Sequence, residues 1–214
     1  MKGITFGDLH SYRDLHLLLT GKEIGSPETK RLKIDVPGAD GGIDYTEFFG
    51  EPKYEDVTHK FTFAAIAPTT AFPALFSTVK NALHGRKMRI ILDDEPQFYY
   101  VGRLEVSPFT NDKNIGTIKI DAECEPFKYK LNKTTITRAV DGTESIVLTN
   151  SRKRAVPEVT IAAEGSMRIV YGENIWDLGG GSYTLPELEL LEGANAVTVT
   201  GTGTVSFTWQ EASL

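Results

Sequence analysis

Three adjacent acidic residues, Asp93, Asp94 and Glu95, form the part of the sequence whose residue types most directly point to chemistry. Two carboxyl groups can hydrolyse a glycosidic bond when one has a shifted pKa and the other stands at a defined distance. Here the acids lie between two runs of strong strand formers, MRIIL and FYYVGRLEV, and a proline follows them. The sequence therefore predicts an exposed hairpin tip, on which neighbouring side chains diverge and stay in water.

The other residue types that catalyse reactions or bind metals are scattered. The four histidines lack the spacing of metal ligands, and the single cysteine, Cys124, lies on the apolar side of an alternating run. The glycine-rich segment LGGGSY lacks the Lys-Ser/Thr of a phosphate-binding loop and is interpreted as a mobile loop between strands. Glu187 and Glu189 share a face of an expected strand and are solvated, so a glycosidase is the weakest function class. We predict no catalytic residue, no metal site and no cofactor.

Length and charge bound the remaining classes of function. The 214 residues suffice for one large domain or two small ones, and the formal net charge is −6. A chain with this charge and no basic patch is not expected to bind nucleic acid specifically. The N-terminus lacks the apolar run of a signal peptide, and no segment approaches the ~20 apolar residues of a membrane helix. We expect synthesis in the cytoplasm and no membrane contact.

The first part of the sequence predicts a β domain with one helix. The runs RLKIDV, HKFTFAAI and GTIKIDAEC alternate apolar and polar residues, as half-buried strands do. In TAFPALFSTVKNALHG the apolar residues instead recur at helical spacing, at Phe72, Leu75, Phe76, Val79 and Leu83. Thr70 is the expected N-cap, and Gly85 can end the helix. We predict a β-barrel or β-sandwich over residues 1–132, with one amphipathic helix lying on a sheet.

The second part of the sequence predicts a small β-sandwich over residues 133–214. Its strand-forming runs are SIVLTN, PEVTIAAE, MRIVYG, ELELLEG, AVTVTG and TVSFTWQ, and none of them has a helical period. A turn is expected at Asp141-Gly142. Trp176 and Tyr183, on either side of the glycine-rich segment, could stack on sugar rings or complete the packing of the sandwich. A carbohydrate-binding module for host-surface glycans is therefore kept as an alternative function.

Four blocks of the sequence, in order, resemble the distal tail proteins of long-tailed bacteriophages, the Dit family. They are IDVPGADGGIDYTEFFGEPKYEDVTHKFTFAA, NALHGRKMRIILDDEPQFYYVGRLEV, IKIDAECEPFKYK and PELELLEGANAVTVTGTGTVSFTWQEASL. They resemble, in turn, the family's PG-x-DG turn before a Phe-rich strand, its helix and acidic hairpin, its Glu-Cys-x-Pro ending of the first domain, and its closing strands with a Gly193–Asn195 turn. His59-Lys60 stands where many relatives have an arginine.

The resemblance implies a structural protein of the phage virion tail, without enzymatic activity. Members of the family form a six-fold ring at the tail tip, with a tail-tube-like first domain and a galectin-like or jelly-roll second domain. One face of the ring meets the tail-tube protein, the other meets the tail-tip or tail-associated protein, and DNA passes through the channel. An acidic chain suits such a channel, because like charge lowers its affinity for DNA phosphates.

Two exposed turns are our candidates for the interfaces of such a ring. The candidate residues are Asp40, Gly41 and Gly42 in one turn, and Asp93, Asp94 and Glu95 in the other. If an acidic face lines the channel, the second turn is an interface or lumen element. Both placements are hypotheses that follow from the resemblance and from the expected exposure of the turns.

Overall fold

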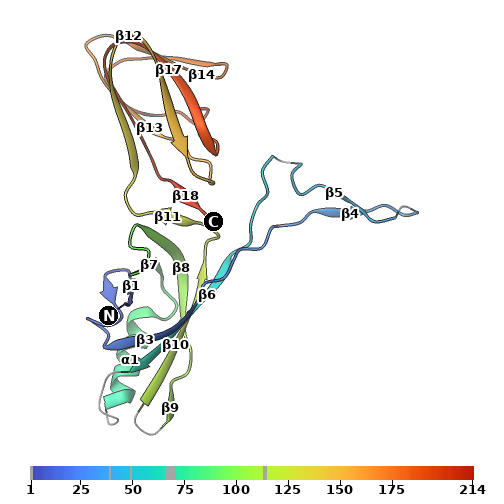
Figure 1. Ribbon diagram of the computed structural model, residues 1–214, viewed down its shortest axis with the longest axis vertical. Helices are drawn as coiled ribbons and strands as arrows, with labels where there is room; N and C mark the ends of the chain where they lie inside the picture. The colour runs from blue at the N-terminus through green and yellow to red at the C-terminus, as the bar shows by residue number, and fades with distance from the viewer. Residues whose placement is uncertain (1, 39, 49, 66–70, 113–114) are drawn as a thin grey trace. The chain divides into compact units, whose positions relative to one another are not determined.

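The structure is a computed structural model in which residues 2–38, 40–48, 50–65, 71–112 and 115–214 are described. Contacts divide the chain into unit 1, which comprises Met1–Lys128 with Leu214, and unit 2, which comprises Tyr129–Ser213. The sequence placed this division after residue 132. Figure 1 shows strands throughout both units and one helix among the described residues. The prediction of a mainly β fold with one helix is confirmed.

Unit 1 is built on one large antiparallel sheet with the strand order β2-β1-β7-β8-β10-β6-β3, and β9 pairs with β10 (Figure 1). The strands are β1 (Ile4–Phe6), β2 (Leu9–His10), β3 (Leu17–Glu23), β6 (Val57–Ala65), β7 (Lys87–Leu92), β8 (Phe98–Val106), β9 (Thr110–Asp112) and β10 (Ile115–Cys124). The register of β10 against β6 sets Ile118 opposite Phe63 and Ile120 opposite Phe61. Opposite residues point to the same face of a sheet, so this register assembles one apolar surface.

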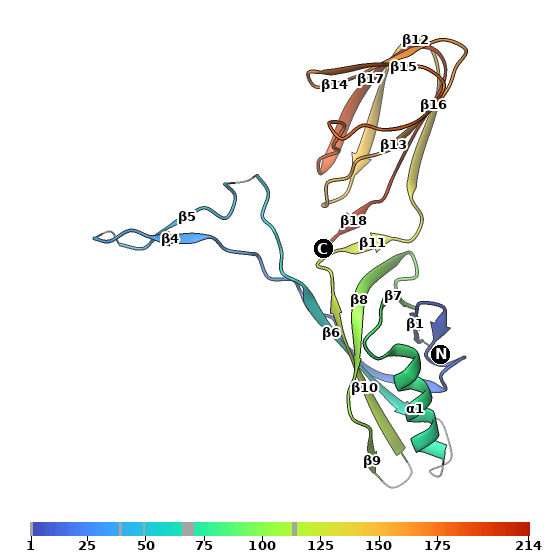
Figure 2. The same cartoon turned by 180° about the vertical axis from the view of Figure 1, so that it is seen from behind.

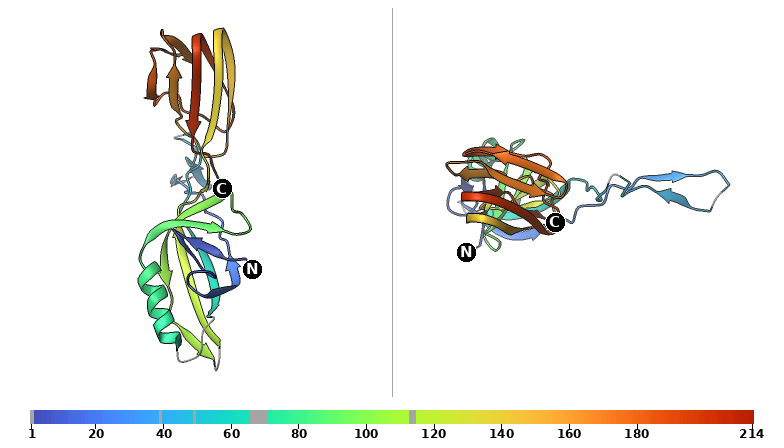
Figure 3. Two further views of the ribbon diagram at one scale, coloured as in Figure 1. Left: turned by 90° about the vertical axis from the view of Figure 1, so that its left-hand side faces the viewer. Right: turned by 90° about the horizontal axis from the view of Figure 1, so that it is seen from above.

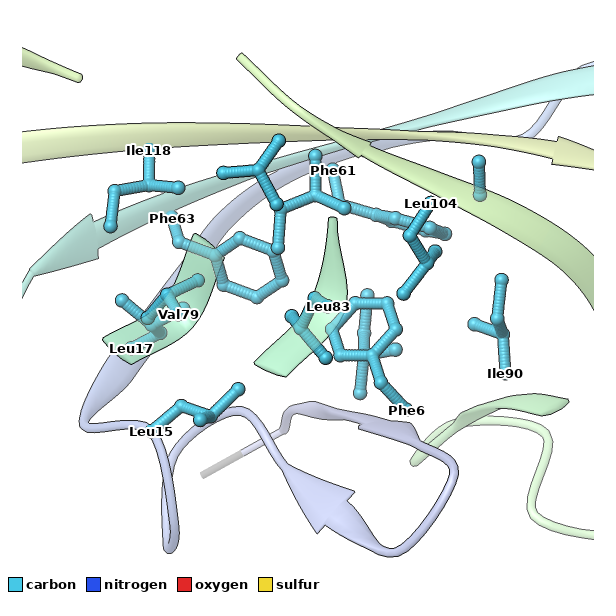
Figure 4. Close-up of a cluster of buried hydrophobic side chains, with 14 of the residues drawn as sticks. Phe6, Leu15, Leu17, Phe61, Phe63, Val79, Leu83, Ile90, Leu104 and Ile118 are labelled. Carbon is cyan, nitrogen blue, oxygen red and sulfur yellow. The ribbon is translucent and has the colours of Figure 1, made fainter. Parts of the chain in front are cut away.

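The core of unit 1 lies on that apolar surface (Figure 4). Phe6 of β1 lies edge-on to Phe61 and Phe63 of β6, with ring centroids 6.0 and 6.2 Å apart. The period-two pattern predicted the buried residues of β6 and β10 correctly: Phe61, Phe63, Ile118, Ile120, Ala122 and Cys124. Cys124 is thus a small core residue, as its position in the alternation indicated.

Helix α1 (Phe72–Leu83) lies against this core (Figure 3, left). The predicted apolar face is confirmed: Phe72, Val79 and Leu83 are buried, and Leu75 and Phe76 pack partly buried against the core or its neighbours. The helix begins after Ala71, and the expected N-cap, Thr70, lies outside the described residues. It ends where the His84 N–H donates to the Lys80 carbonyl, and Gly85 follows at φ +75°, a conformation that favours glycine.

Between β3 and β6 the chain forms a long excursion, residues 24–56, which we call the arm. Its strands β4 (Lys33–Asp35) and β5 (Gly42–Asp44) form a separate two-stranded antiparallel sheet in which every residue is exposed. In Figure 2 they run as a narrow ribbon with no third strand beside them. A two-stranded hairpin alone is marginally stable in water. The described chain therefore does not supply the packing that such a hairpin usually needs.

Unit 2 is organised around β12 (Thr134–Asn150) and β17 (Gly193–Trp209), which pair antiparallel along all 17 residues of each strand. The other strands of its sheet are β13 (Glu158–Ala162), β14 (Met167–Tyr171), β15 (Asn174–Leu178) and β16 (Gly181–Thr184). The free edge of β17 pairs first with β14 and then with β13, and β15 and β16 extend these two pairings. Both sets of strands contribute to a single core, consistent with the expected sandwich.

Asn195 lies near the start of β17, and its side chain makes several hydrogen bonds there. Asn195 is 5% exposed, and its side-chain oxygen accepts hydrogen bonds from the Tyr171 hydroxyl and the Leu191 N–H, both at 2.9 Å. Its amide nitrogen donates to the carbonyls of Leu191 and Gly193 at 2.9 and 3.1 Å. A buried amide with both ends paired fixes the loop that leads into β17.

Four local predictions in unit 2 were wrong. The run ELELLEG forms no strand, and only Leu190 makes an isolated bridge, to Ala155. Residues 181–183 of the segment predicted to be a loop belong to β16, and the turns expected at Asp141-Gly142 and at Gly193–Asn195 lie inside β12 and β17. In each case a strand was predicted where the chain turns, or a turn was predicted where the chain forms a strand, and glycine or glutamate is frequent in these segments.

Among the described residues, no helix has the length and apolar character that a membrane span requires.

Candidate functional site

The acidic turn, which we define as Asp93, Asp94 and Glu95, connects β7 to β8 as the sequence predicted. The Glu95 N–H donates to the Leu92 carbonyl, and the Phe98 N–H donates to the Glu95 carbonyl, both at 3.0 Å. The three carboxylates diverge, also as predicted, but they do not simply remain in water. Each contacts a partner from a different segment of unit 1.

Asp93 ties the turn to the N-terminal segment. Its Oδ2 accepts a hydrogen bond from the Gly3 N–H at 2.7 Å and lies 3.1 Å from His10 Nε2. His10 Nδ1 accepts from the N–H groups of Tyr12 and Arg13, both at 3.2 Å. Because Nδ1 is occupied as an acceptor, the imidazole proton lies on Nε2 and is donated to Asp93. His10 is 5% exposed, whereas the Asp93 side chain is 30% exposed, so the contact is partly shielded from solvent.

Asp94 and Glu95 form more exposed ion pairs. Asp94 Oδ2 pairs with Lys22 Nζ of β3, and Glu95 Oε1 lies 2.8 Å from Lys128 Nζ of β11 (Lys128–Lys130). Partly exposed pairs of this kind contribute roughly 0–1 kcal/mol each. All three acids are therefore matched by donors of the same unit, which leaves little uncompensated negative charge at the turn.

The electrostatics of the turn do not favour acid–base catalysis. Burial opposes the ionisation of Asp93, but hydrogen bonds from His10 and Gly3 outweigh it and hold the pKa of this carboxyl below its usual value. The hydrogen bond from Lys22 likewise lowers the pKa of Asp94. A general acid near neutral pH needs a raised pKa instead. The arrangement is that of a structural tie between strands.

In the other candidate turn, Asp40 and Gly41 lie in the arm between β4 and β5, and Gly42 is the first residue of β5. All three residues are exposed. Beside it runs an apolar stripe, which we define as Leu32, Ile34, Val36 and Ile43, with exposed fractions of 48, 50, 39 and 50%. Ile34 and Ile43 are directly opposite each other across the β4–β5 pair. The alternation of RLKIDV signalled an apolar face, but nothing in the sequence indicated that the described chain leaves this face uncovered.

Trp176 and Tyr183 lie on β15 and β16, and both are partly buried against the core of unit 2. The Tyr183 hydroxyl donates to the Gly179 carbonyl at 3.2 Å. The core thus covers part of the Trp176 and Tyr183 rings, which would otherwise be available for stacking on a sugar. Stacking on sugar stays a prediction for these two residues.

The remaining residues that could do chemistry are occupied structurally. Burial raises the pKa of the Cys124 thiol to about 12, so a reactive thiolate is disfavoured at neutral pH. Glu189 pairs with Arg154 at 2.9 Å, and Glu187 lies in a turn rather than on a strand. Within the described ranges, no group of three or more His, Cys, Asp or Glu side chains has a geometry that could hold a metal ion.

Comparison with solved structures supplies the strongest evidence about this fold. The chain is similar to the crystal structure of the SPP1 Dit (gp 19.1) protein, described as a paradigm of the hub adsorption apparatus in phages that infect Gram-positive bacteria. The similarity covers 100% of both chains with a TM-score of 0.71, at 17% sequence identity. The chain has the Dit fold. No protein-family model and no curated protein matches the sequence.

The Dit fold accounts for the order of elements in both units. The sequence blocks that resembled the family correspond to the arm with β6, the helix with the acidic turn, β10, and β17 with the segment before it. The residues that the fold brings together around the acidic turn, such as His10, Lys22 and Lys128, were not found from the sequence. They come from distant segments, and no local pattern marks them as partners of the acids.

Proposed function

We propose that this chain is a structural hub of a phage tail tip, in which six copies form a ring around a channel for DNA. The observation that carries the proposal is the full-length Dit fold, shared with a protein described as part of a hub adsorption apparatus. One face of the ring contacts the tail-tube protein, and the other contacts the tail-tip or tail-associated protein. The chain acts in the virion tail and is not an enzyme.

The arm supports this proposal because it has the chemistry of a contact between copies. A monomer that keeps four aliphatic side chains exposed along one hairpin loses hydrophobic stabilisation that a neighbour can restore. In a ring, each copy meets the next through two different surfaces, so an arm on one copy can pack on another surface of its neighbour. Assembly also covers sheet edges that a lone β protein would expose. The acidic net charge keeps the channel from binding DNA.

We expect Ile34→Asp to prevent ring formation while the monomer stays folded. Ile34 is 50% exposed in the chain, so the change costs the monomer little, but it places a charge in the contact between copies. A loss of about 2 kcal/mol per contact weakens that contact about thirtyfold. Light scattering over a concentration series and electron microscopy of the wild type and the variant measure the effect.

Val147→Asp is the matched control for this experiment. Val147 is 53% exposed on β12 of unit 2, so the same charge enters a similarly exposed β position outside the arm. We expect this variant to form six-fold rings like the wild type. Equal ring formation by Ile34→Asp would remove the arm from the interface. A wild-type chain that stays monomeric both alone and with its tail-tube protein would contradict the hub itself.

A further inference from the structure

The root of the arm contains a buried histidine that none of the contacts described so far uses. His59 lies on β6, three residues after the arm ends, and is 1% exposed. Its Nδ1 accepts a hydrogen bond from the N–H of Gly25, at the start of the arm, at 3.1 Å. This bond adds to the backbone contacts that join the two ends of the excursion, residues 24–56. Glu23 pairs with Lys60 just outside it, and the Glu55 N–H donates to the Glu28 carbonyl at 2.8 Å.

The contact between Gly25 and β6 is close. A Cβ atom placed at Gly25 would lie 2.7 Å from the Thr58 carbonyl oxygen and 2.7 Å from Val57 Cγ2. Real Cβ atoms do not approach other atoms so closely, so only glycine allows the chain to pass here. The His59 bond therefore acts on a segment that is already packed against β6.

The geometry also fixes the protonation state of His59. An Nδ1 that accepts from a backbone N–H carries no proton, so the proton of the neutral ring lies on Nε2. Within the described residues, Nε2 has no hydrogen-bond partner. The ring lies edge-on to Tyr100 of β8, with centroids 4.5 Å apart, and Ala122 of β10 is opposite on the other strand. A second proton would turn Nδ1 into a donor facing another donor, and the bond to Gly25 would be lost.

The surroundings offer little to stabilise a charged imidazolium. His59 lines an open pocket of about 450 Å³ together with Lys22 of β3, Asp94 and Glu95 of the acidic turn, Tyr100 of β8 and Lys128 of β11. Both acids are already paired with these two lysines, so the four formal charges sum to zero. Of the other titratable groups nearby, Cys124 of β10 is neutral, and the carboxylates of Glu125 and of Asp56, at the end of the arm, act on its thiol.

We propose that His59 is a pH-sensitive latch, which holds the root of the arm while its imidazole is neutral and releases Gly25 when the imidazole is protonated. The latch lies within one copy of the chain and does not depend on a ring. Its consequence, that acid loosens the contact between copies in the ring, rests on the function proposed above.

The direction of the pH effect follows from burial. Burial lowers the pKa of His59 below the ordinary value of 6.5, so the unfolded or opened arm root binds the proton more readily than the closed one. The closed state is then fully favoured above about pH 6.5 and loses stability as the pH falls below that value. At pH 5.0 an opened state with an ordinary histidine gains population by a factor of up to about thirty.

The test is hydrogen exchange at the Gly25 amide in the wild type, His59→Asn and His59→Phe at pH 7.5 and 5.0. Asparagine keeps an acceptor near the position of Nδ1 and does not titrate, whereas phenylalanine keeps the ring against Tyr100 and removes the acceptor. Because variants are compared at the same pH, the intrinsic pH dependence of exchange cancels. His16→Asn is the control, since His16 is exposed and its φ of 54° suits asparagine.

We expect the wild type and His59→Asn to exchange alike at pH 7.5. At pH 5.0 the wild type should exchange faster than His59→Asn, by a factor of up to about thirty, and His59→Phe should exchange fast at both values. His16→Asn should follow the wild type throughout. Equal exchange of the wild type and His59→Asn at both values would overturn the latch.

A titration of the wild type alone covers the case in which a variant does not fold. The pH midpoint of Gly25 exchange, corrected for its intrinsic rate, should coincide with the midpoint of the His59 imidazole followed by NMR. Different midpoints would overturn the latch. The ring is tested separately by its mass. Rings that are absent at every pH, both without and with the tail-tube protein, contradict the proposed hub, while coincident midpoints still support the latch.

Discussion

Replacing Gly203 with alanine should destabilise unit 2 by about 3 kcal/mol, although the change adds a single methyl group. Gly203 has φ +152°, a region that side chains with a Cβ rarely adopt. A Cβ atom there would lie 2.7 Å from the Ala162 carbonyl oxygen and 2.7 Å from Ala163 Cβ. The strain of the backbone and the overlap with its neighbour each cost roughly 1–3 kcal/mol.

The position of Gly203 explains why the strand cannot adapt. Residues Thr198–Thr200 of β17 pair with β14, and residues Thr204–Thr208 pair with β13. The strand changes neighbours between these segments, at Gly201 and Gly203, and this change gives the sheet of unit 2 its two halves. A shift that relieved the overlap at Gly203 would disturb the pairing on one side or the other.

Urea unfolding followed by tryptophan fluorescence measures this effect in unit 2 alone, because both tryptophans of the chain, Trp176 and Trp209, lie there. Thr200→Ala is the control. Thr200 is exposed on the same strand, where its hydroxyl shares a hydrogen bond with Thr143 at 3.0 Å, and its loss should cost about 1 kcal/mol or less. A Gly203→Ala variant no less stable than Thr200→Ala would show that β17 does not need glycine at this bend.

The same strand shows how much of the fold the sequence could predict. We expected two strands, AVTVTG and TVSFTWQ, because glycines separate them. Yet the buried residues, Val197, Val199, Val205, Phe207 and Trp209, all have odd numbers. A period of two that keeps its phase across two glycines indicates one bent strand rather than a turn between two. The sequence thus contains the period-two signal of a single strand, and the interpretation of the glycines as strand breakers was wrong.

Other features could not be predicted from one sequence. Local period and capping residues indicated α1, β6 and β10, since those signals lie within a few neighbouring residues. The partners of the acidic turn lie on strands that are distant in sequence, and their contacts depend on the order of strands in the sheet. The apolar stripe of the arm was visible as alternation, but whether the chain covers such a face depends on tertiary structure. Exposure of the stripe is therefore information that the fold adds.

The acidic turn gives the other large expected effect. Asp93→Ala should destabilise unit 1 by about 2–4 kcal/mol, because it leaves the buried Gly3 N–H and the proton on His10 Nε2 without their acceptor. Asp94→Ala removes a more exposed pair with Lys22 and should cost about 1 kcal/mol or less. Unfolding followed by circular dichroism compares the two variants, and the tryptophan signal of unit 2 serves as an internal reference.

Asp93→Asn separates charge from hydrogen bonding, since asparagine keeps an acceptor oxygen without the negative charge. The pKa of Asp93 is lowered in the folded chain, so its charge stabilises unit 1 above the ordinary pKa near 3.8, and this contribution is lost as the pH falls through the folded value. The difference in stability between the wild type and Asp93→Asn should therefore disappear in strong acid. A difference that persists there would point to packing rather than charge.

These variants also decide what the acidic turn does for a hub. If the turn is a structural tie, ring formation should follow stability, and Asp94→Ala should assemble like the wild type. If the turn instead contacts another copy or lines the channel, Asp94→Ala should lose ring formation or DNA passage while the monomer keeps its stability. The first outcome is expected, because the three carboxylates of the acidic turn are already paired with His10, Lys22 and Lys128 within unit 1. A carboxylate that is paired inside its own subunit has little attraction left for a partner.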